Sequence, residues 1–319
     1  MTRAIACIVA DWGTTNLRVW AMGADGTTFE RRDSDRGLLA VEGGRFSVAL
    51  AEACGDWLVG RQRLPIVMSG MVGSKLGWKE VPYLTAPFAL DQLAQYLCPV
   101  ETPASATAWI VPGVCLDDPA QPDVMRGEET QILGALQELR VDDGVFLLPG
   151  THAKWAIVEG RHLVSFRTYM TGELYGLLHR YGTLRQLMEG EASGDDAFRQ
   201  GVIRARAPEA GNLLHSLFSV RTLGLLDRLP RRDLAGYMSG LLIGAEMQDG
   251  LSWLRARGKP RIAVGIGSPD MLKAYRTAAS VCGLEFSTLD SATVTPRALL
   301  SIAESAGLVT PGAPELDLA

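Results

Sequence analysis

The sequence predicts an α/β protein built from two similar halves, and three observations support this fold class. The chain has 319 residues, and about 150 residues is a working estimate for one domain. Short apolar strands alternate with helical patterns, which is typical of mixed sheets flanked by helices. A strand, a Gly-Thr turn, a strand, a turn and a third strand occur near the N-terminus and again 137 residues later. We therefore expect two domains, at 1–143 and 144–319, and leave open whether the last helix packs back on the first.

Three strands are predicted at the start of the chain. Residues 5–10 are a continuous apolar run, as in strands that are buried on both faces. Residues 17–22 predict the second strand, and the turn at 23–26 separates it from a third strand at 27–32.

The rest of the first half mixes helices with loops. Apolar residues at helical spacing predict a helix over 46–58, and a short strand follows at 65–69. Residues 99–123 contain five prolines and are expected to be rich in loops. A helix is predicted from about Glu128 to Leu139, because its apolar residues share one face.

The second half opens like the first. Strands are predicted at 145–148, 155–158 and 162–169. They align with the opening strands when Gly13-Thr14 is placed on Gly150-Thr151. Chance similarity between two hairpins is the alternative, but a duplicated domain agrees better with the length of the chain.

The last third alternates helices with strands. A long helix is predicted over 232–257 and a strand over 261–267. Ser268-Pro269 is a helix start signal, and that helix should end at Gly283. Thr295-Pro296 repeats the start signal for a last helix that ends at Gly307.

Composition narrows the class of protein. With 31 Lys and Arg against 36 Asp and Glu, the net charge of −5 argues against a nucleic-acid partner, which needs a basic surface. The longest uncharged apolar stretch outside the first strand has 12 residues, short of the ~18 that a membrane span requires. Five cysteines without metal-ligand or redox spacing indicate the reducing cytosol. We expect a soluble, cytoplasmic protein without membrane contact.

The first Gly-Thr turn carries the strongest local signal for chemistry. Asp11 follows a buried strand, where an unpaired charge would be costly, and Gly13, Thr14 and Thr15 form the turn. Successive N–H groups in such a turn bind anions, and the hydroxyls add donors. A carboxylate beside bound phosphates is a ligand for Mg²⁺, which we assign to Asp11.

The second turn offers a similar cradle. Gly150 and Thr151 repeat the Gly-Thr pair, and Lys154 adds a cation that can stabilise charge on a phosphate. Together the two turns predict a phosphate clamp in a cleft between two lobes.

Two phosphate loops on duplicated hairpins resemble the arrangement of the actin-like ATPase and sugar kinase superfamily. The chain closely resembles one family within it, the 2-dehydro-3-deoxygalactonokinases. The resemblance covers nearly the whole chain in order, through the blocks DWGTTNLR (11–18), SGMVGSKLGWKEVPYL (69–84), MRGEETQ (125–131), LPGTHAKW (148–155), FRTYMTGEL (166–174) and SGLLIGAE (239–246).

This resemblance implies a fold and an activity. The fold would be two duplicated RNase H-like (actin-like) domains, each with a mixed five-stranded sheet flanked by helices. The activity would be phosphorylation of the 6-hydroxyl of 2-dehydro-3-deoxy-D-galactonate with ATP and Mg²⁺, in galactonate catabolism. The partners would be the sugar acid and ATP, and a homodimer stays open.

The resemblance also suggests roles for further residues. Phosphoryl transfer needs a carboxylate near the attacking hydroxyl, for which Glu129 and Glu128 come ahead of Asp11. The second loop has no Asp after its glycine, unlike many sugar kinases, so the base is not settled by the motif. The substrate carboxylate should meet an arginine, for which Arg126 and Arg167 are the candidates.

Two loops complete the predicted site. Ser69, Gly70 and Met71 look like a substrate-side loop. Gly265, Gly267 and Ser268 resemble the adenosine loop of the superfamily, although a plain tight turn explains the glycines equally well.

Other functions stay open beside the main one. The chain could phosphorylate another sugar or sugar acid, and the glutamate pair is also similar to that of phosphohydrolases of the superfamily. A sugar-sensing regulator is disfavoured, because the first strand begins by Ile5 and leaves no room for a DNA-binding domain before it.

Overall fold

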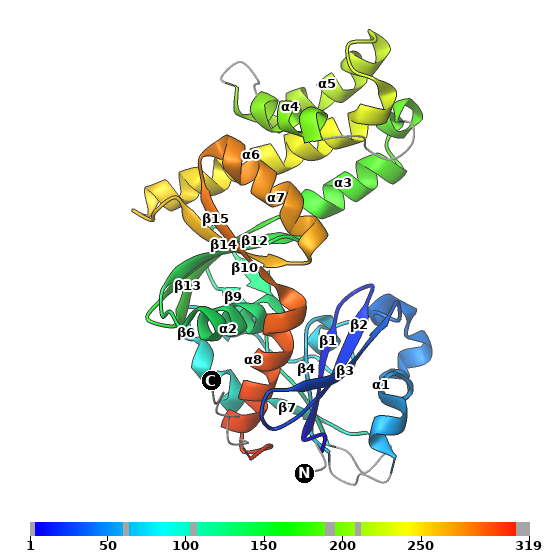
Figure 1. Ribbon diagram of the computed structural model, residues 1–319, viewed down its shortest axis with the longest axis vertical. Helices are drawn as coiled ribbons and strands as arrows, with labels where there is room; N and C mark the ends of the chain where they lie inside the picture. Colours follow the sequence, from blue (N-terminus) through cyan, green and yellow to red (C-terminus); the bar gives the residue numbers. More distant parts are fainter. Residues whose placement is uncertain (1–3, 60–63, 103–106, 189–194, 208–211, 311–319) are drawn as a thin grey trace, which may run out of the picture. The chain divides into compact units, whose positions relative to one another are not determined.

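The computed structural model describes residues 4–59, 64–102, 107–188, 195–207 and 212–310 (Figure 1). The chain divides into two compact units. The first contains Met1–Asp143, Ile157–Phe166 and Ser291–Ala319, and the second contains Gly144–Ala156 and Arg167–Asp290. The last helix, α8 (Ser291–Ser305), therefore belongs to the first unit.

A six-stranded sheet forms the centre of the first unit. Its order is β3-β2-β1-β4-β8-β7, with β1 antiparallel to β2 and parallel to β4. The bounds are β1 (Cys7–Trp12), β2 (Leu17–Met22), β3 (Thr28–Ser34), β4 (Ile66–Ser69), β7 (Cys98–Val100) and β8 (Ala108–Ile110). The three predicted opening strands are present, but β1 continues to Trp12, so that Asp11 lies in the strand and not in the turn after it.

Helices cover both faces of this sheet. Ile8, Ala10 and Trp12 alternate along β1 and share one apolar cluster with residues of α1 (Phe46–Cys54), and α8 packs on β1 and β4. The helix predicted over 46–58 is too long. It ends at Cys54, because Gly55 has a φ of +53°, and a 3-10 turn (Gly55–Leu58) follows.

Residues 99–123 are more regular than predicted. Besides β8 and part of β7, they contain β9 (Val114–Leu116) and the start of β10 (Asp123–Met125). These two strands and β5 (Leu84–Thr85) form a small sheet of order β10-β9-β5. Strands of two or three residues are too short for an alternating pattern to appear in the sequence. Helix α2 (Glu128–Leu139) has the predicted bounds.

The other large sheet repeats the topology of the first. Its order is β15-β14-β11-β12-β13-β6, in which β13-β12-β11-β14 corresponds to β3-β2-β1-β4. The bounds are β6 (Phe88–Ala89), β11 (Gly144–Leu148), β12 (Ala153–Glu159), β13 (His162–Tyr169), β14 (Ile262–Gly267) and β15 (Glu285–Asp290). As β1 is parallel to β4, so is β11 to β14. The predicted duplication is confirmed, with six strands in each large sheet instead of five.

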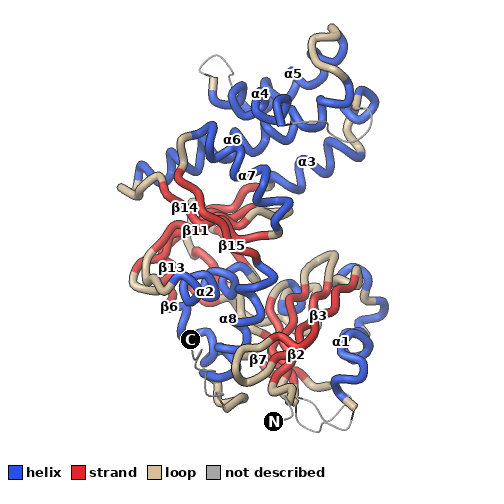
Figure 2. The backbone as a smooth tube through the Cα atoms, in the orientation of Figure 1, coloured by secondary structure: helices blue, strands red, loops and turns tan. Residues whose placement is uncertain are grey.

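The second unit carries a group of helices that the sequence predicted only in part. Figure 2 shows α3 (Thr171–Arg180), α4 (Asp195–Arg206), α5 (Leu213–Leu225) and α6 (Leu234–Ala256) together, with no strand between them. Helices α4 and α6 approach so closely that a Cβ on Gly240 would lie only 2.0 Å from the carbonyl oxygen of Phe198. Only α6 was predicted among these four.

The start signals of the last two helices had different outcomes. Helix α7 (Pro269–Cys282) begins after Ser268 and ends at the left-handed Gly283, as predicted. The predicted start at Thr295-Pro296 is wrong, because α8 begins at Ser291 and contains Pro296. Val294 packs so tightly on α2 that a Cβ on Gly134 would lie 2.4 Å from its carbonyl oxygen, and this contact fixes residues before the proline.

None of the helices in the described part of the chain is long and apolar enough to cross a membrane.

Candidate active site

The carboxyl ends of β1 and β4 bring Asp11 and Ser69 side by side in parallel register. The chain then turns at Gly70, whose φ is +94°. A Cβ there would lie 2.8 Å from the carbonyl oxygen of Trp12 and 3.4 Å from Oδ1 of Asp11. A Cβ on Gly127 would in turn lie 3.1 Å from the Cα of Gly70. Glycine at both positions therefore lets the start of α2 approach Asp11.

Asp11 is held by an arginine that the sequence analysis did not single out. Arg18 lies opposite Asp11 in the β1–β2 hairpin, and its Nη1 is 3.1 Å from Oδ2 of Asp11. The Asp11 side chain is 17% exposed. Burial raises the pKa of Asp11, and the Arg18 charge acts in the opposite direction. A hairpin register counted across the turn at 13–16 would have paired the two residues.

The predicted first phosphate loop, the turn at Gly13–Thr15, is held by hydrogen bonds to the segment Gly37–Leu39. The carbonyls of Gly13–Thr15 accept hydrogen bonds of 3.0 to 3.2 Å from the N–H groups of Gly37–Leu39. A Cβ on Gly37 would lie 2.2 Å from the carbonyl carbon of Thr15. The side chains of Thr14 and Thr15 are exposed. The loop thus turns its carbonyls toward this segment and offers its hydroxyls to the solvent.

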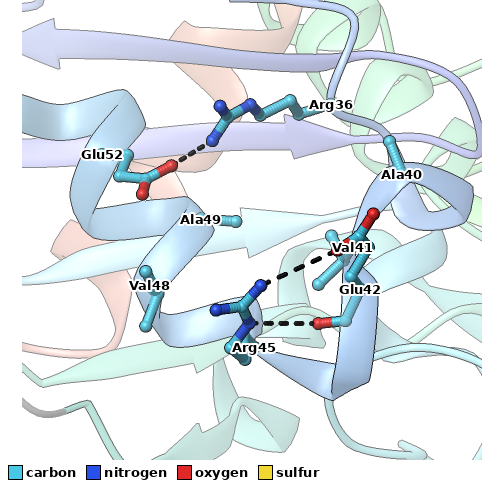
Figure 3. A pocket seen from close by; sticks show the side chains of 8 residues that line it. All are labelled: Arg36, Ala40, Val41, Glu42, Arg45, Val48, Ala49 and Glu52. Atoms are coloured by element: carbon cyan, nitrogen blue, oxygen red, sulfur yellow. Dashed lines mark hydrogen bonds and ion pairs between the residues drawn. The ribbon is translucent and has the colours of Figure 1, made fainter.

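A cavity of about 330 Å³ adjoins the same segment (Figure 3). It is lined by Arg36, Ala40, Val41, Glu42, Arg45, Val48, Ala49 and Glu52. Arg36 pairs with Glu52, and Arg45 lies 3.9 Å from Glu42. No predicted site residue lines this cavity, and its arginines already have carboxylate partners, so we place no substrate there.

The predicted glutamates lie at the start of α2, after Gly127, whose φ is +105°. Oε2 of Glu128 accepts a 2.9 Å hydrogen bond from the N–H of Arg126. Both carboxylate oxygens of Glu129 accept from the N–H of Gly127, at 2.9 and 2.8 Å. Glu129 is completely buried, and this burial, with a contribution from the Glu128 charge, raises its pKa to about 7. Glu129 can therefore gain or lose a proton near neutral pH.

Arg126 is a buried cation with donors left over. It is 8% exposed, its Nη2 donates to the carbonyl of Val81 at 2.7 Å, and its guanidinium lies 4.3 Å from the ring centre of Tyr83. Nε and Nη1 of Arg126 have no hydrogen-bond partner, and the same is true of Oγ of Ser69 and Ser74. Buried donors without acceptors are costly, so these four atoms indicate a place for an anionic or polar ligand.

The predicted second phosphate loop, at Gly150 and Thr151, lies in the second unit, after β11. Parallel pairing of Leu147 with Gly265 brings it to the same sheet edge as the predicted adenosine loop. A Cβ on Gly267 would lie 3.6 Å from Pro149. Lys154 was predicted in the turn, but it lies within β12 and is only 4% exposed.

The remaining predicted residues are Arg167 and Met71. Arg167 belongs to the second unit, where its Nη1 is 2.6 Å from Oδ2 of Asp249. The hydroxyl of Tyr169 donates to the same oxygen at 2.7 Å. Met71 begins a 3-10 turn (Met71–Gly73) directly after Gly70. Within the first unit the structure therefore gathers Asp11, Ser69, Gly70 and the glutamate pair, and within the second unit Arg167 is held in an ion pair with Asp249.

The donor set around Asp11 suits a metal that the substrate helps to hold. Among the described residues, no three His, Cys, Asp or Glu side chains are grouped as a metal site. Mg²⁺ does not need such a group, since it commonly binds one or two carboxylates together with phosphate oxygens and water. Asp11 fits that role.

Solved structures first define the fold. An activator of 2-hydroxyisocaproyl-CoA dehydratase from Clostridium difficile, solved with bound ADPNP, matches at a TM-score of 0.51, with 12% identity over 94% of this chain and 96% of that chain. A structure from Sinorhizobium meliloti, provisionally named a 2-dehydro-3-deoxygalactonokinase, matches at a TM-score of 0.85. It is 32% identical and covers 94% of this chain and 98% of its own.

Sequence relatives carry the same name. The 2-dehydro-3-deoxygalactonokinase of Escherichia coli (strain K12) is 38% identical over 75% of this chain and 78% of its own length. The protein DgoK1 of Rhizobium meliloti (strain 1021), provisionally named as that enzyme, is 34% identical over 91% of this chain and 94% of its own.

The repeated sheet topology and the Gly-Thr turns define an α/β protein of the actin-like ATPase fold. A family model described as 2-keto-3-deoxy-galactonokinase matches residues 11–302. The chain belongs to this family and is a phosphotransferase with an alcohol group as acceptor.

The buried carboxyl of Glu129 should make stability depend on pH. A pKa raised to about 7 means that the native state favours the protonated form, so the stabilisation is present in acid and is lost as the pH rises to about 7. Glu129→Gln removes this titration. From pH 5.5 to pH 8, the free energy of unfolding of the original protein should therefore fall by about 1–3 kcal/mol relative to that of the variant. Urea denaturation at both pH values measures the difference, and an unchanged difference would contradict the buried carboxyl.

Proposed function

We propose that this chain transfers a phosphoryl group from ATP, with Mg²⁺, to the 6-hydroxyl of 2-dehydro-3-deoxy-D-galactonate in galactonate catabolism. The observation that carries the proposal is the buried guanidinium of Arg126, which has two unused donors in the same unit as Asp11 and Glu129. An anionic sugar acid needs such a cation, and an alcohol acceptor needs a carboxylate. The name of the Escherichia coli relative supports the choice of substrate.

The substrate carboxylate is proposed to bind at Arg126. The Nε–H and Nη1–H groups of Arg126 can each donate to an anionic oxygen of the substrate. The hydroxyls of Ser69 and Ser74 are further donors for the carboxylate or its neighbouring oxo group. Arg167 is the weaker candidate, because Asp249 already neutralises its charge.

Glu129 is proposed as the catalytic base. In phosphoryl transfer the substrate oxygen forms a bond to the γ-phosphorus, the bond to the ADP oxygen breaks, and the hydroxyl proton must be accepted. A carboxylate with a pKa near 7 is suited to that step at neutral pH, whereas an ordinary glutamate is a weaker base. Glu128 and Asp11 stay as alternatives. Glu128 lies beside Glu129 in the sequence, and Asp11 is paired with Arg18.

The nucleotide is assigned to the loops of each unit. Gly13, Thr14 and Thr15 in the first unit and Gly150, Thr151 and Lys154 in the second are proposed to bind its phosphates. Gly265, Gly267 and Ser268 are proposed for the adenosine side. Asp11 would hold Mg²⁺, which supplies neutralisation of phosphate charge when bound.

The reaction is tested with purified protein, ATP, Mg²⁺ and a panel of 2-oxo-3-deoxy sugar acids and neutral sugars. We expect ADP release that depends on the galactonate compound, with one phosphate added per ADP. Release that requires a different acceptor would change the substrate. ADP and phosphate release at the same rate without any acceptor would favour a phosphohydrolase.

Replacement of Arg126 by lysine tests the carboxylate site. The charge is kept but the planar set of N–H donors is lost, so KM for the sugar acid should rise about 10-fold or more, with KM for ATP little changed. Steady-state kinetics with either substrate varied separate the two effects. Arg167→Lys provides the comparison. If KM for the sugar acid rises in Arg167→Lys and not in Arg126→Lys, the substrate carboxylate binds at Arg167 instead.

The base is tested by the pH dependence of kcat/KM. A base must be deprotonated, so kcat/KM of the original protein should rise with pH and level off above about pH 7. Glu129→Gln should lower kcat by about 100-fold or more and abolish this rise. If Glu129→Gln keeps normal turnover and Glu128→Gln or Asp11→Asn does not, the base is one of the latter residues.

A further inference from the structure

A second buried carboxylate, Glu246, lies in the middle of α6 and has no role in the proposed reaction. It is 3% exposed, and burial raises its pKa. Oε1 of Glu246 accepts a 2.9 Å hydrogen bond from Nε1 of Trp155. Oε2 accepts from the hydroxyls of Thr171, at 2.6 Å, and Tyr275, at 2.8 Å. These four residues are called the Glu246 cluster.

The cluster connects segments that are distant in the sequence. Trp155 comes from β12, Thr171 from the first turn of α3 and Tyr275 from α7. Three sequence blocks that resemble the kinase family, 148–155, 166–174 and 239–246, contribute to it. A carboxylate is costly to bury, and an apolar side chain would fill α6 without that cost. The three donors therefore indicate that Glu246 fixes the geometry of its neighbours.

The neighbour that matters is the first turn of α3, which lies against the second phosphate loop. A Cβ on Gly172 would lie 2.3 Å from the carbonyl oxygen of Gly150 and 3.0 Å from the Cα of Thr151. The N–H of Glu173 donates to the carbonyl of Thr151 at 2.9 Å. Oε2 of Glu173 lies 2.6 Å from Nε2 of His152. Three successive residues, beginning with Thr171, thus link Glu246 to the loop.

We propose that Glu246 is a positioning residue for the second phosphate loop: through Thr171 it holds the first turn of α3 against Gly150–His152 and so sets the affinity for the phosphates of ATP. The proposal rests on the assignment of this loop to ATP. Glu246 itself is buried and touches no substrate. Its effect should appear in nucleotide binding and not in sugar-acid binding, which the proposed site assigns to the first unit.

Thr171→Val is the mildest variant that tests this link. It removes the hydroxyl that donates to Glu246 but keeps the shape of the side chain. We expect KM for ATP to rise about 5- to 10-fold while KM for the sugar acid stays within about twofold. Gly172→Ala should have a larger effect, because its methyl group would collide with the carbonyl of Gly150.

Gly176→Ala is the matched control. It lies on the same helix, and a Cβ there meets no atom within 4 Å. Both kinetic constants should remain within about twofold of the original protein. If Gly176→Ala raises KM for ATP as much as Gly172→Ala, the contact with the loop is not the cause and the proposal is overturned.

Replacement of Glu246 separates hydrogen bonding from packing. In Glu246→Gln, the amide oxygen can accept from Trp155 and the amide N–H groups can donate to the hydroxyls of Thr171 and Tyr275. The glutamine variant should therefore retain KM for ATP within about threefold, whereas Glu246→Leu should raise it at least about 10-fold. Equal losses in both variants, on both substrates alike, would indicate a general packing role and contradict positioning.

Hydrogen exchange of the loop without nucleotide distinguishes this inference from the proposed function. Thr171→Val should speed amide exchange in peptides covering 149–156 and 171–175, and Gly176→Ala should not. Faster exchange with unchanged KM for ATP would support the positioning and overturn the assignment of the loop to ATP. Unchanged exchange together with unchanged KM for ATP would overturn the positioning itself.

Discussion

The candidate active site depends on one close approach of the backbone, between Gly70 and Gly127. The space between them leaves no room for a side chain without movement, since a Cβ on Gly127 would lie 3.1 Å from the Cα of Gly70. This approach carries the start of α2, with Glu128 and Glu129, toward Asp11 at the end of β1. Burial raises the pKa of both Asp11 and Glu129, and the charge of Glu128 adds to the rise. The close approach of the backbone therefore contributes to the raised pKa values of these two carboxyls.

The charged residues of the predicted site differ in how far their hydrogen bonding is satisfied. Asp11 has Arg18, and Glu129 has the N–H of Gly127. Arg126 keeps two donors without partners, whereas Arg167 is paired with Asp249. A completed ion pair is explained by its own partners. A buried cation with donors that lack partners has a remaining cost that a ligand can remove, and this difference favours Arg126 over Arg167 for the substrate carboxylate.

The sequence predicted the features that local chemistry determines, and it missed those that tertiary packing determines. The duplication, the start of α2 at Glu128 and the two ends of α7 follow from apolar runs and capping residues. The short strands between Cys98 and Met125 carry too few residues for a periodic signal. The start of α8 was misplaced because its contact with Gly134 has no signature near Pro296. The Glu246 cluster joins residues up to 120 positions apart, so no single segment of sequence indicates it.

The duplication also explains why the two hairpins carry different chemistry. At the offset of 137, the positions of Asp11 and Arg18 are occupied by Leu148 and Trp155, which are both buried. The second hairpin has therefore no acidic residue opposite a basic one, and Trp155 donates to Glu246 instead. Lys154 takes the position of Leu17, which is 1% exposed, and this inward position accounts for the burial of a lysine that was predicted in the turn. One copy thus has a carboxylate beside its Gly-Thr turn, and the other has the turn and a buried cation, so two copies of one topology carry different chemical groups at corresponding positions.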